Sequence, residues 1–184
     1  MTDIPRPALL RALGRRLDLR LVLFLAVLAL GFGIVFANRE PIAARFATAK
    51  PAHLPDLSLL AVQSLAVQAH VWLALVAMIL GGVMLASPKG VRFHRIAGWT
   101  WASLMTVVAA SSFAIPTVAP GTWSYIHLVS GWVLVGLPIG LVAARRHKVV
   151  AHRRSMLWLY WGFLIGAFAF TLIPGRLMWE LVFA

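Results

Sequence analysis

Five long apolar runs divide the chain, and the polar and charged residues gather in the segments between them. The runs are Leu19–Ala37, Ser58–Ala86, Ile96–Ile115, Trp123–Ala144 and Ser155–Leu172. A helix needs about 20 apolar residues to cross a bilayer. Because a segment in lipid must satisfy its backbone N–H and C=O groups internally, runs of this length form helices. The pattern predicts an all-α integral membrane protein with five transmembrane helices.

The segment between the first two runs contains three prolines and several polar residues, which indicates an external loop. A short interfacial helix is expected in it around Ile42–Ala49. We therefore expect two parts. Residues 1–57 form a basic arm, a peripheral first helix and the external loop, and residues 58–184 form a four-helix transmembrane core.

Composition supports a membrane protein and removes several other classes. Of the 184 residues, 61% are hydrophobic and 12% are charged, whereas charged residues make up about 25% of soluble domains. The absence of cysteine excludes a disulfide scaffold and thiolate-held iron–sulfur clusters.

The net charge of +12 indicates the orientation of the chain in the membrane. Thirteen of the 17 Lys and Arg residues lie in the N-terminal arm up to Arg20 or follow the second and fourth runs, and four lie on the other side. Positive residues concentrate on the cytoplasmic side of membrane proteins, so the N-terminus is expected in the cytoplasm of a bacterium and the protein in its inner membrane. The net positive charge is then explained by the orientation of the chain in the membrane and by binding to anionic lipid, and no nucleic-acid partner is expected.

Four histidines are the candidate functional residues, because no Asp, Glu, Lys or Arg lies in the middle of any run and ionisable residues within a membrane are usually functional. Each of the last four helices carries one of them. Counted along the helices at 1.5 Å per residue, His70 and His127 share an outer level roughly 27 Å from the cytoplasmic boundary. His94, roughly 9 Å inside a helix expected to open at Ser87-Pro88, shares an inner level with His152.

Two histidines at one depth on facing helices are typical axial ligands of a b-type haem in a helical bundle. The sequence therefore predicts two haem b groups, with His70 and His127 on one iron and His94 and His152 on the other. The motif H-x-x-x-G-W occurs twice, at His94 and at His127. Its glycines, Gly98 and Gly131, would leave room for a flat macrocycle one turn from each ligand.

Haem propionates need cationic partners near the membrane surface. Candidates at the inner level are Lys89, Arg95 and Arg153, and the candidate at the outer level is Arg176. The same cations also fit an ordinary orientation signal.

The histidine layout from about Ser58 to Phe170 looks like that of the cytochrome b561 family, whose members carry two haems and pass electrons across a membrane. Residues that bind ascorbate in that family cannot be traced here. A second resemblance, to an uncharacterised family of bacterial predicted membrane proteins without assigned activity, spans Gln68 to Met178. It rests on K-G-x-x-x-H-R-I-A-G-W from Lys89, S-F from Ser112, I-H-L from Ile126, H-R-R-S-M from His152 and F-T-L-I-P-G-R from Phe170.

The resulting hypothesis is a di-haem b-type cytochrome that moves electrons across or within the inner membrane, with quinone as the expected partner. It would be an electron-transfer protein or an oxidoreductase subunit, and no catalytic residue is assigned. The leading alternative is a non-catalytic accessory subunit of a larger respiratory or photosynthetic complex; a homodimer is also open. A polar histidine network, a zinc or copper site and a small transporter are further alternatives, the last disfavoured because no carboxylate lies near the midplane.

Overall fold

The structure, a computed structural model, describes residues 39–115 and 125–183, together with Ala26, Ala29, Gly33 and Ala37. The chain divides into two compact units, Met1–Ala37 and Asn38–Ala184. The expected first span, Leu19–Ala37, lies outside the described residues except for these four, which are helical.

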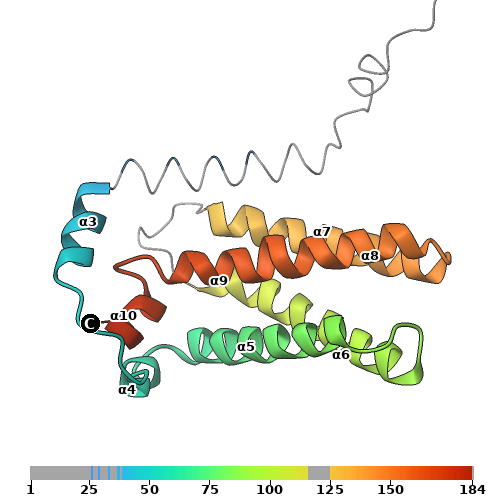
Figure 1. Ribbon diagram of the computed structural model, residues 1–184, viewed down its shortest axis with the longest axis horizontal. Coiled ribbons are helices and arrows are strands. Elements are labelled where there is room, and N and C mark those ends of the chain that lie inside the picture. Colours follow the sequence, from blue (N-terminus) through green and yellow to red (C-terminus); the bar gives the residue numbers. More distant parts are fainter. Residues whose placement is uncertain are drawn as a thin grey trace, which may run out of the picture. The chain divides into compact units, whose positions relative to one another are not determined.

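Within residues 39–115 and 125–183 every regular element is a helix and no strand occurs, so the predicted all-α class is confirmed. The long elements of this unit are α5 (Leu65–Ala86), α6 (Arg92–Ser111), α7 (Tyr125–Arg145), and a continuous stretch made of α8 (Val149–Leu157), the π-helix η2 (Trp158–Ile165) and α9 (Gly166–Thr171). A short 3-10 helix, η1 (Ser112–Ala114), extends α6. Figure 1 shows that successive long helices run in opposite directions.

Three helices in the described part of the chain are long and apolar enough to cross a membrane. They are Leu65–Ala86, Arg92–Ala114 and His127–Arg145. Of the expected runs, Ser58–Ala86 is not one helix, because it divides into α4 (Leu57–Ala61) and α5. Ser64 causes the division: its backbone is non-helical and its hydroxyl accepts a hydrogen bond from the N–H of Val67, which caps α5.

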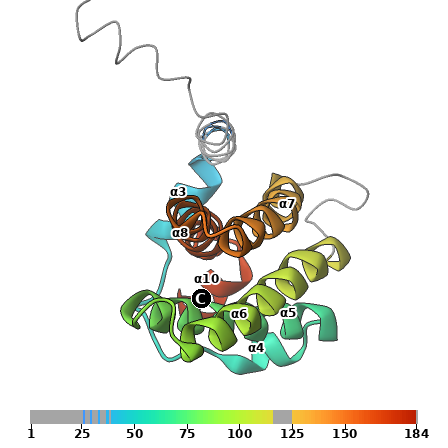
Figure 2. The same cartoon turned by 90° about the vertical axis from the view of Figure 1, so that its right-hand side faces the viewer.

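The long helices form two antiparallel pairs, α5 with α6 and α7 with the α8–α9 stretch (Figure 2). The pairs are joined because α6 also packs on α7 and α5 also packs on η2. In this order around the bundle, α5 is diagonally opposite α7, and α6 is diagonally opposite α8. Short connections at residues 87–91 and 146–148 favour this antiparallel arrangement.

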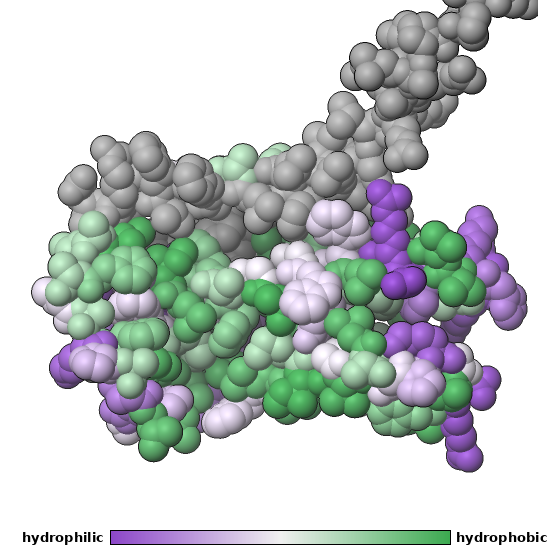
Figure 3. Space-filling view, in the orientation of Figure 1, coloured by the Kyte–Doolittle hydropathy of each residue, from purple (hydrophilic) through white to green (hydrophobic). Residues whose placement is uncertain are grey.

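Hydrophilic side chains gather at the end of the bundle that holds these two connections (Figure 3). We call it the basic end; its exposed cations are Lys89, Arg92, Arg95, Arg145, Arg146, Lys148, Arg153 and Arg154. Hydrophobic side chains cover most of the coloured surface between this end and the opposite one. This distribution is typical of a helical bundle surrounded by lipid.

The middle of the bundle is closely packed around Gly81 on α5. A Cβ atom at Gly81 would lie 2.5 Å from the Tyr160 ring and 2.8 Å from the Trp101 indole nitrogen. The indole N–H of Trp101 donates to the Ala77 carbonyl at 3.0 Å, and the Tyr160 hydroxyl donates to the Met78 carbonyl at 3.1 Å. Glycine at position 81 thus lets two aromatic side chains reach the backbone of α5.

Short segments from both ends of the described chain form a cap at the end opposite the basic end. It consists of α3 (Arg39–Ala47), the loop 48–56, α4 and α10 (Leu177–Phe183). Backbone N–H groups of Lys50, His53 and Asp56 donate to the last three carbonyls of α10 at 2.9–3.1 Å, which satisfies acceptors that a helix end leaves open. Helix α3 agrees with the short helix expected around Ile42–Ala49, whereas α10 was not anticipated.

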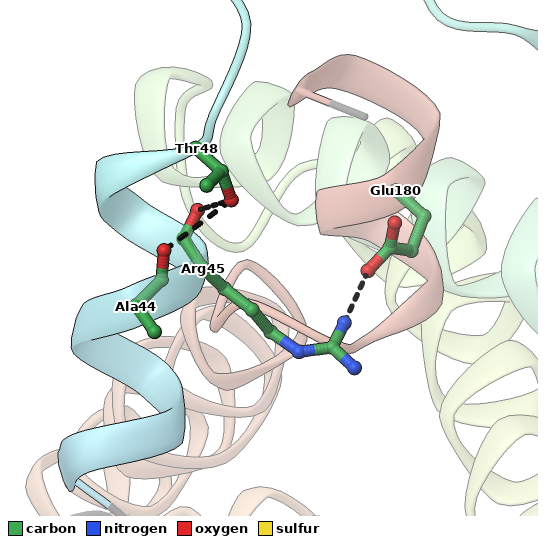
Figure 4. Close-up of polar contacts among 4 residues, drawn as sticks. All are labelled: Ala44, Arg45, Thr48 and Glu180. Carbon is green, nitrogen blue, oxygen red and sulfur yellow. Dashed lines mark hydrogen bonds and ion pairs between the residues drawn. The ribbon is translucent and has the colours of Figure 1, made fainter.

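An ion pair and an aromatic contact also join α3 to α10. Arg45 Nη1 lies 3.2 Å from Glu180 Oε1 (Figure 4), and the rings of Phe46 and Trp179 meet edge to face. At the start of α4, the hydroxyl and the backbone N–H of Ser58 donate to the Asp56 carboxylate and hold the pKa of Asp56 below its usual value.

Replacing Gly81 with Ala should destabilise the bundle, because the new methyl group overlaps the Tyr160 ring. Overpacking of this kind costs about 1–3 kcal/mol, and the midpoint of thermal unfolding in detergent should fall. Gly166→Ala is the matched control, because the nearest atom to its Cβ is at an ordinary 3.7 Å. Equal midpoints for the two variants would contradict the close packing at Gly81.

Candidate functional site

His70 and His94 lie on the buried faces of their helices. His70 precedes Ala77 and Gly81 on α5 by seven and eleven residues, and both of these are buried. His94 precedes Trp101 and Met105 on α6 by the same two intervals, and these too are buried. Because residues seven and eleven apart share a helix face, both histidines face the interior of the bundle.

His127 on α7 and His152 on α8 also lie on the buried faces of their helices. His127 lies one turn before Ser130, which is buried, and His152 lies one turn before Ser155 and two turns before Leu159, both of which are buried. The side chains of all four histidines are half-buried. The structure therefore places each predicted histidine on the inward face of a different helix.

The outer level is defined by the short segment that ends α6. Nδ1 of His70 lies 2.9 Å from Oγ of Ser111. The His127 ring packs on Phe113, with ring centroids 5.5 Å apart and planes tilted by 33°. Both histidines therefore lie at the depth of residues 111–113, as their positions along the helices predict. They come from the diagonally opposite helices α5 and α7.

A pair of buried hydroxyls joins α6 to α7 at this depth. Ser112 Oγ lies 2.6 Å from Ser130 Oγ and also donates to the Ala109 carbonyl at 2.8 Å. In an apolar interior a hydroxyl needs such a partner. Ser112 was marked beforehand only by the S-F pair of the family resemblance, although a polar residue near the end of an apolar run is a usable signal, and Ser130 was not marked.

The inner level lies in the first turns of α6 and α8, where His94 and His152 stand. The expected depth of His94 is wrong in one respect. Helix α6 begins at Arg92 and not at Ser87-Pro88, because Ser87 is the C-cap of α5 and Gly90 takes a positive φ of 81° in the connection. His94 is therefore at the very end of its helix.

His152 has a defined tautomer. Its Nδ1 lies 3.0 Å from the carbonyl oxygen of Gly140 on α7, and a carbonyl can only accept a hydrogen bond. Nδ1 therefore carries the hydrogen, and the neutral ring keeps a free lone pair on Nε2. Gly140 also allows α8 to pack closely on α7, because a Cβ atom there would lie 3.1 Å from the Cβ of Ser155 and would overlap the terminal methyl group of Met156.

His94 has a polar atom without a partner. Its Nδ1 is buried and makes no hydrogen bond within the described part of the chain. Lys89 and His152 lie close enough to the His94 ring to interact with it electrostatically, although α6 and α8 are diagonally opposite. A buried ring nitrogen without a hydrogen-bond partner is unfavourable, so this position needs a partner that the described residues do not supply.

The two glycines of the repeated motif differ in their surroundings. Among the described residues, a Cβ atom at Gly131 would meet nothing within 4 Å, and one at Gly98 would lie 3.5 Å from the terminal methyl group of Met84. Gly131 is thus uncrowded by the described residues one turn from His127, and Gly98 is in ordinary contact with α5.

Lys89 has a role that its sequence position did not suggest. Its ammonium group donates to the carbonyls of Met84, Leu85 and Ser87 at 2.6–2.9 Å. These bonds use its three donors and cap the C-terminus of α5. Arg95 and Arg153 are exposed and each follows an inner histidine directly, so they remain available to an anionic group.

At the cap, the Arg176 guanidinium lies over the Phe170 ring, 4.7 Å from its centroid. The fold also brings a second cation to the residue before Arg176. The Arg45 guanidinium would be 3.3 Å from a Cβ atom at Gly175. Arg45 was missed because it is far from Arg176 in the sequence, and no local pattern links the two residues.

The described residues contain no group of three or more His, Cys, Asp or Glu side chains suited to a metal ion. The ligand pattern that they offer is the histidine pair. Two histidines of this kind are able to hold an iron whose other ligands come from a macrocycle.

Comparison with known proteins gives one family. The family described as "Predicted membrane protein (DUF2306)" matches residues 67–183, which include all four histidines. No curated protein and no solved structure matches the chain.

Replacing Lys89 with Ala should shorten α5 and lower stability even in protein that holds no cofactor. A charge that caps a helix end contributes about 0.3–1 kcal/mol, so the thermal midpoint of the cofactor-free protein should fall slightly. In Arg92→Ala, a cation is removed from the N-terminus of α6, where the helix dipole disfavours it. That control should keep or raise the midpoint, and a similar decrease in both variants would argue against the capping role.

Proposed function

The chain belongs to the DUF2306 family of predicted membrane proteins, and from this premise we propose that it is a di-haem b-type cytochrome. In this proposal it spans the bacterial inner membrane with five helices and exchanges electrons with quinone. His70 and His127 hold the outer haem, and His94 and His152 hold the inner haem.

One observation carries the proposal: four histidines face the interior from four different helices, in two pairs at opposite ends of the bundle. Each pair joins diagonally opposite helices. A haem between two such helices receives one imidazole on each face. Histidines that served only as hydrogen-bonding residues would not need to be matched in depth.

The ring nitrogens support ligation. An iron-binding imidazole usually coordinates through one nitrogen and donates a hydrogen bond from the other. His152 already has this form, because Nδ1 donates to Gly140 and Nε2 is free. When bound, haem b supplies a centre that takes up and releases one electron.

The cations near each level would neutralise the propionates. Arg95 and Arg153 serve the inner level in this proposal, and Arg176 serves the outer level with Arg45 beside it. Lys89 is left out of this set, since its donors are occupied by α5. The room that the described residues leave beside Gly131 supports a macrocycle next to His127.

The proposal is tested by the visible spectrum of the purified protein, reduced by dithionite and compared with its air-oxidised form. A sharp b-type α-band with about two haems per chain in a pyridine haemochrome assay is expected. A colourless protein from cells well supplied with haem would overturn the proposal. It would favour the accessory-subunit function, which co-migration with a larger complex in a native gel would support.

Histidine variants test the pairing. His70→Ala and His127→Ala should each remove the same haem, and His94→Ala and His152→Ala the other, leaving about one haem per chain in each case. His53→Ala is the control, because His53 lies in the exposed cap loop and its loss should leave both haems. The assignment would be contradicted if the two variants of one pair lost different haems, or if every variant lost both haems.

The orientation is tested with single cysteines, which the cysteine-free chain allows without background. In intact inverted inner-membrane vesicles, a membrane-impermeant maleimide should label Lys148→Cys at the basic end and not His53→Cys at the cap. Spheroplasts should give the reverse. Labelling of position 53 in the vesicles would contradict a cytoplasmic basic end.

A further inference from the structure

We propose that Ser111 is the positioning residue that fixes the tautomer of His70 and so reserves its Nε2 for the outer iron. This inference rests on the proposed function, because it gives Ser111 a role toward that site. Ser111 would not touch the iron or the macrocycle. It would act only through His70.

The direction of the hydrogen bond between the two residues follows from counting hydrogens. The Ser111 hydroxyl has one hydrogen, and it donates that hydrogen to the Val108 carbonyl at 3.0 Å. Its oxygen can then only accept from His70 Nδ1 at 2.9 Å. The two contacts of the Ser111 hydroxyl together thus require the hydrogen on His70 Nδ1.

A fixed Nδ1–H has a direct consequence for ligand binding. A neutral imidazole has one N–H and one lone pair, so hydrogen on Nδ1 leaves the lone pair on Nε2. His152 reaches the same tautomer through the Gly140 carbonyl. At the outer level the acceptor is a side chain, so it can be removed without changing the backbone.

The position of Ser111 in the last turn of α6 explains why its hydroxyl can accept a hydrogen bond from His70. In the last turn of α6, carbonyls lack some of their helical partners, and a serine can bond back to the carbonyl three residues earlier. That back-bond orients the hydroxyl oxygen toward α5. An alanine at 111 would leave His70 without this acceptor in a part-buried site, and the N–H could then move to Nε2.

A matched control lies next to Ser111 in the sequence. Ser112 is also in the last turn, is buried, and donates to the carbonyl three residues earlier. Its second contact is Ser130 on α7 and not a histidine. Ser112→Ala therefore removes a hydroxyl of the same kind at the same depth while leaving the His70 bond intact.

The first measurement is the nitrogen-15 NMR spectrum of the His70 ring in haem-free protein, with His70→Gln used for assignment. The wild-type protein should show the Nδ1–H tautomer. Ser111→Ala should show a mixture or the Nε2–H tautomer, Ser111→Thr should restore the wild-type pattern, and Ser112→Ala should keep it. An Nε2–H tautomer in the wild-type protein would overturn the proposal even if a variant failed to fold.

The second measurement uses the haem-loaded protein. Loss of a hydrogen bond to a ligating histidine costs roughly 10–100-fold in metal affinity, so Ser111→Ala should weaken one haem by that factor and shift its midpoint potential alone. Ser111→Thr should restore both values. Two unchanged haems in Ser111→Ala would overturn the role of Ser111 and leave the cytochrome proposal standing. Wild-type protein without haem would overturn the cytochrome proposal, while the tautomer measurement would still decide whether Ser111 orients His70.

Discussion

An apolar interior offers no water, so each buried polar group must find its partner inside the protein, and this constraint determines how the helices of this chain meet. Trp101 and Tyr160 each reach a backbone carbonyl of α5, and His152 reaches a carbonyl of α7. One such bond between membrane helices contributes only about 0.6 kcal/mol. Stability therefore comes mainly from the close packing that brings the partners together, as at Gly81 and Gly140.

The same constraint gives the histidines their different chemical states. His152 has a backbone acceptor and His70 has the Ser111 hydroxyl, whereas Nδ1 of His94 is buried and unbonded within the described residues. A nitrogen shielded from water and without a partner is unfavourable in the protein alone. In the proposed cytochrome, a cofactor at the inner level would supply the missing partner.

The two ends of the bundle are built in different ways. The basic end uses short connections and many exposed cations, of which Lys89 caps α5. The opposite end uses a cap in which the loop before α4 bonds to the end of α10, with Arg45 and Glu180 beside it. Because this cap joins segments more than 100 residues apart, it brings the Arg45 guanidinium to Gly175, next to Arg176 in the chain, a placement that no local sequence pattern gives.

The sequence alone determined the helical class, most of the helix positions, the polar connections and the shared depth of His70 and His127. These depend on hydrophobic run length and on the rise per residue, which are local properties of a chain in an apolar medium. The break at Ser64, the start of α6 at Arg92 and the capping by Lys89 rest on hydrogen bonds and backbone angles within a few residues, which run length does not record. The tertiary structure decided which helices pair, the fit of Trp101 and Tyr160 against Gly81, and the approach of Arg45 to Gly175. Each of these depends on which helices become neighbours and how they are rotated, and contacts between distant residues set both.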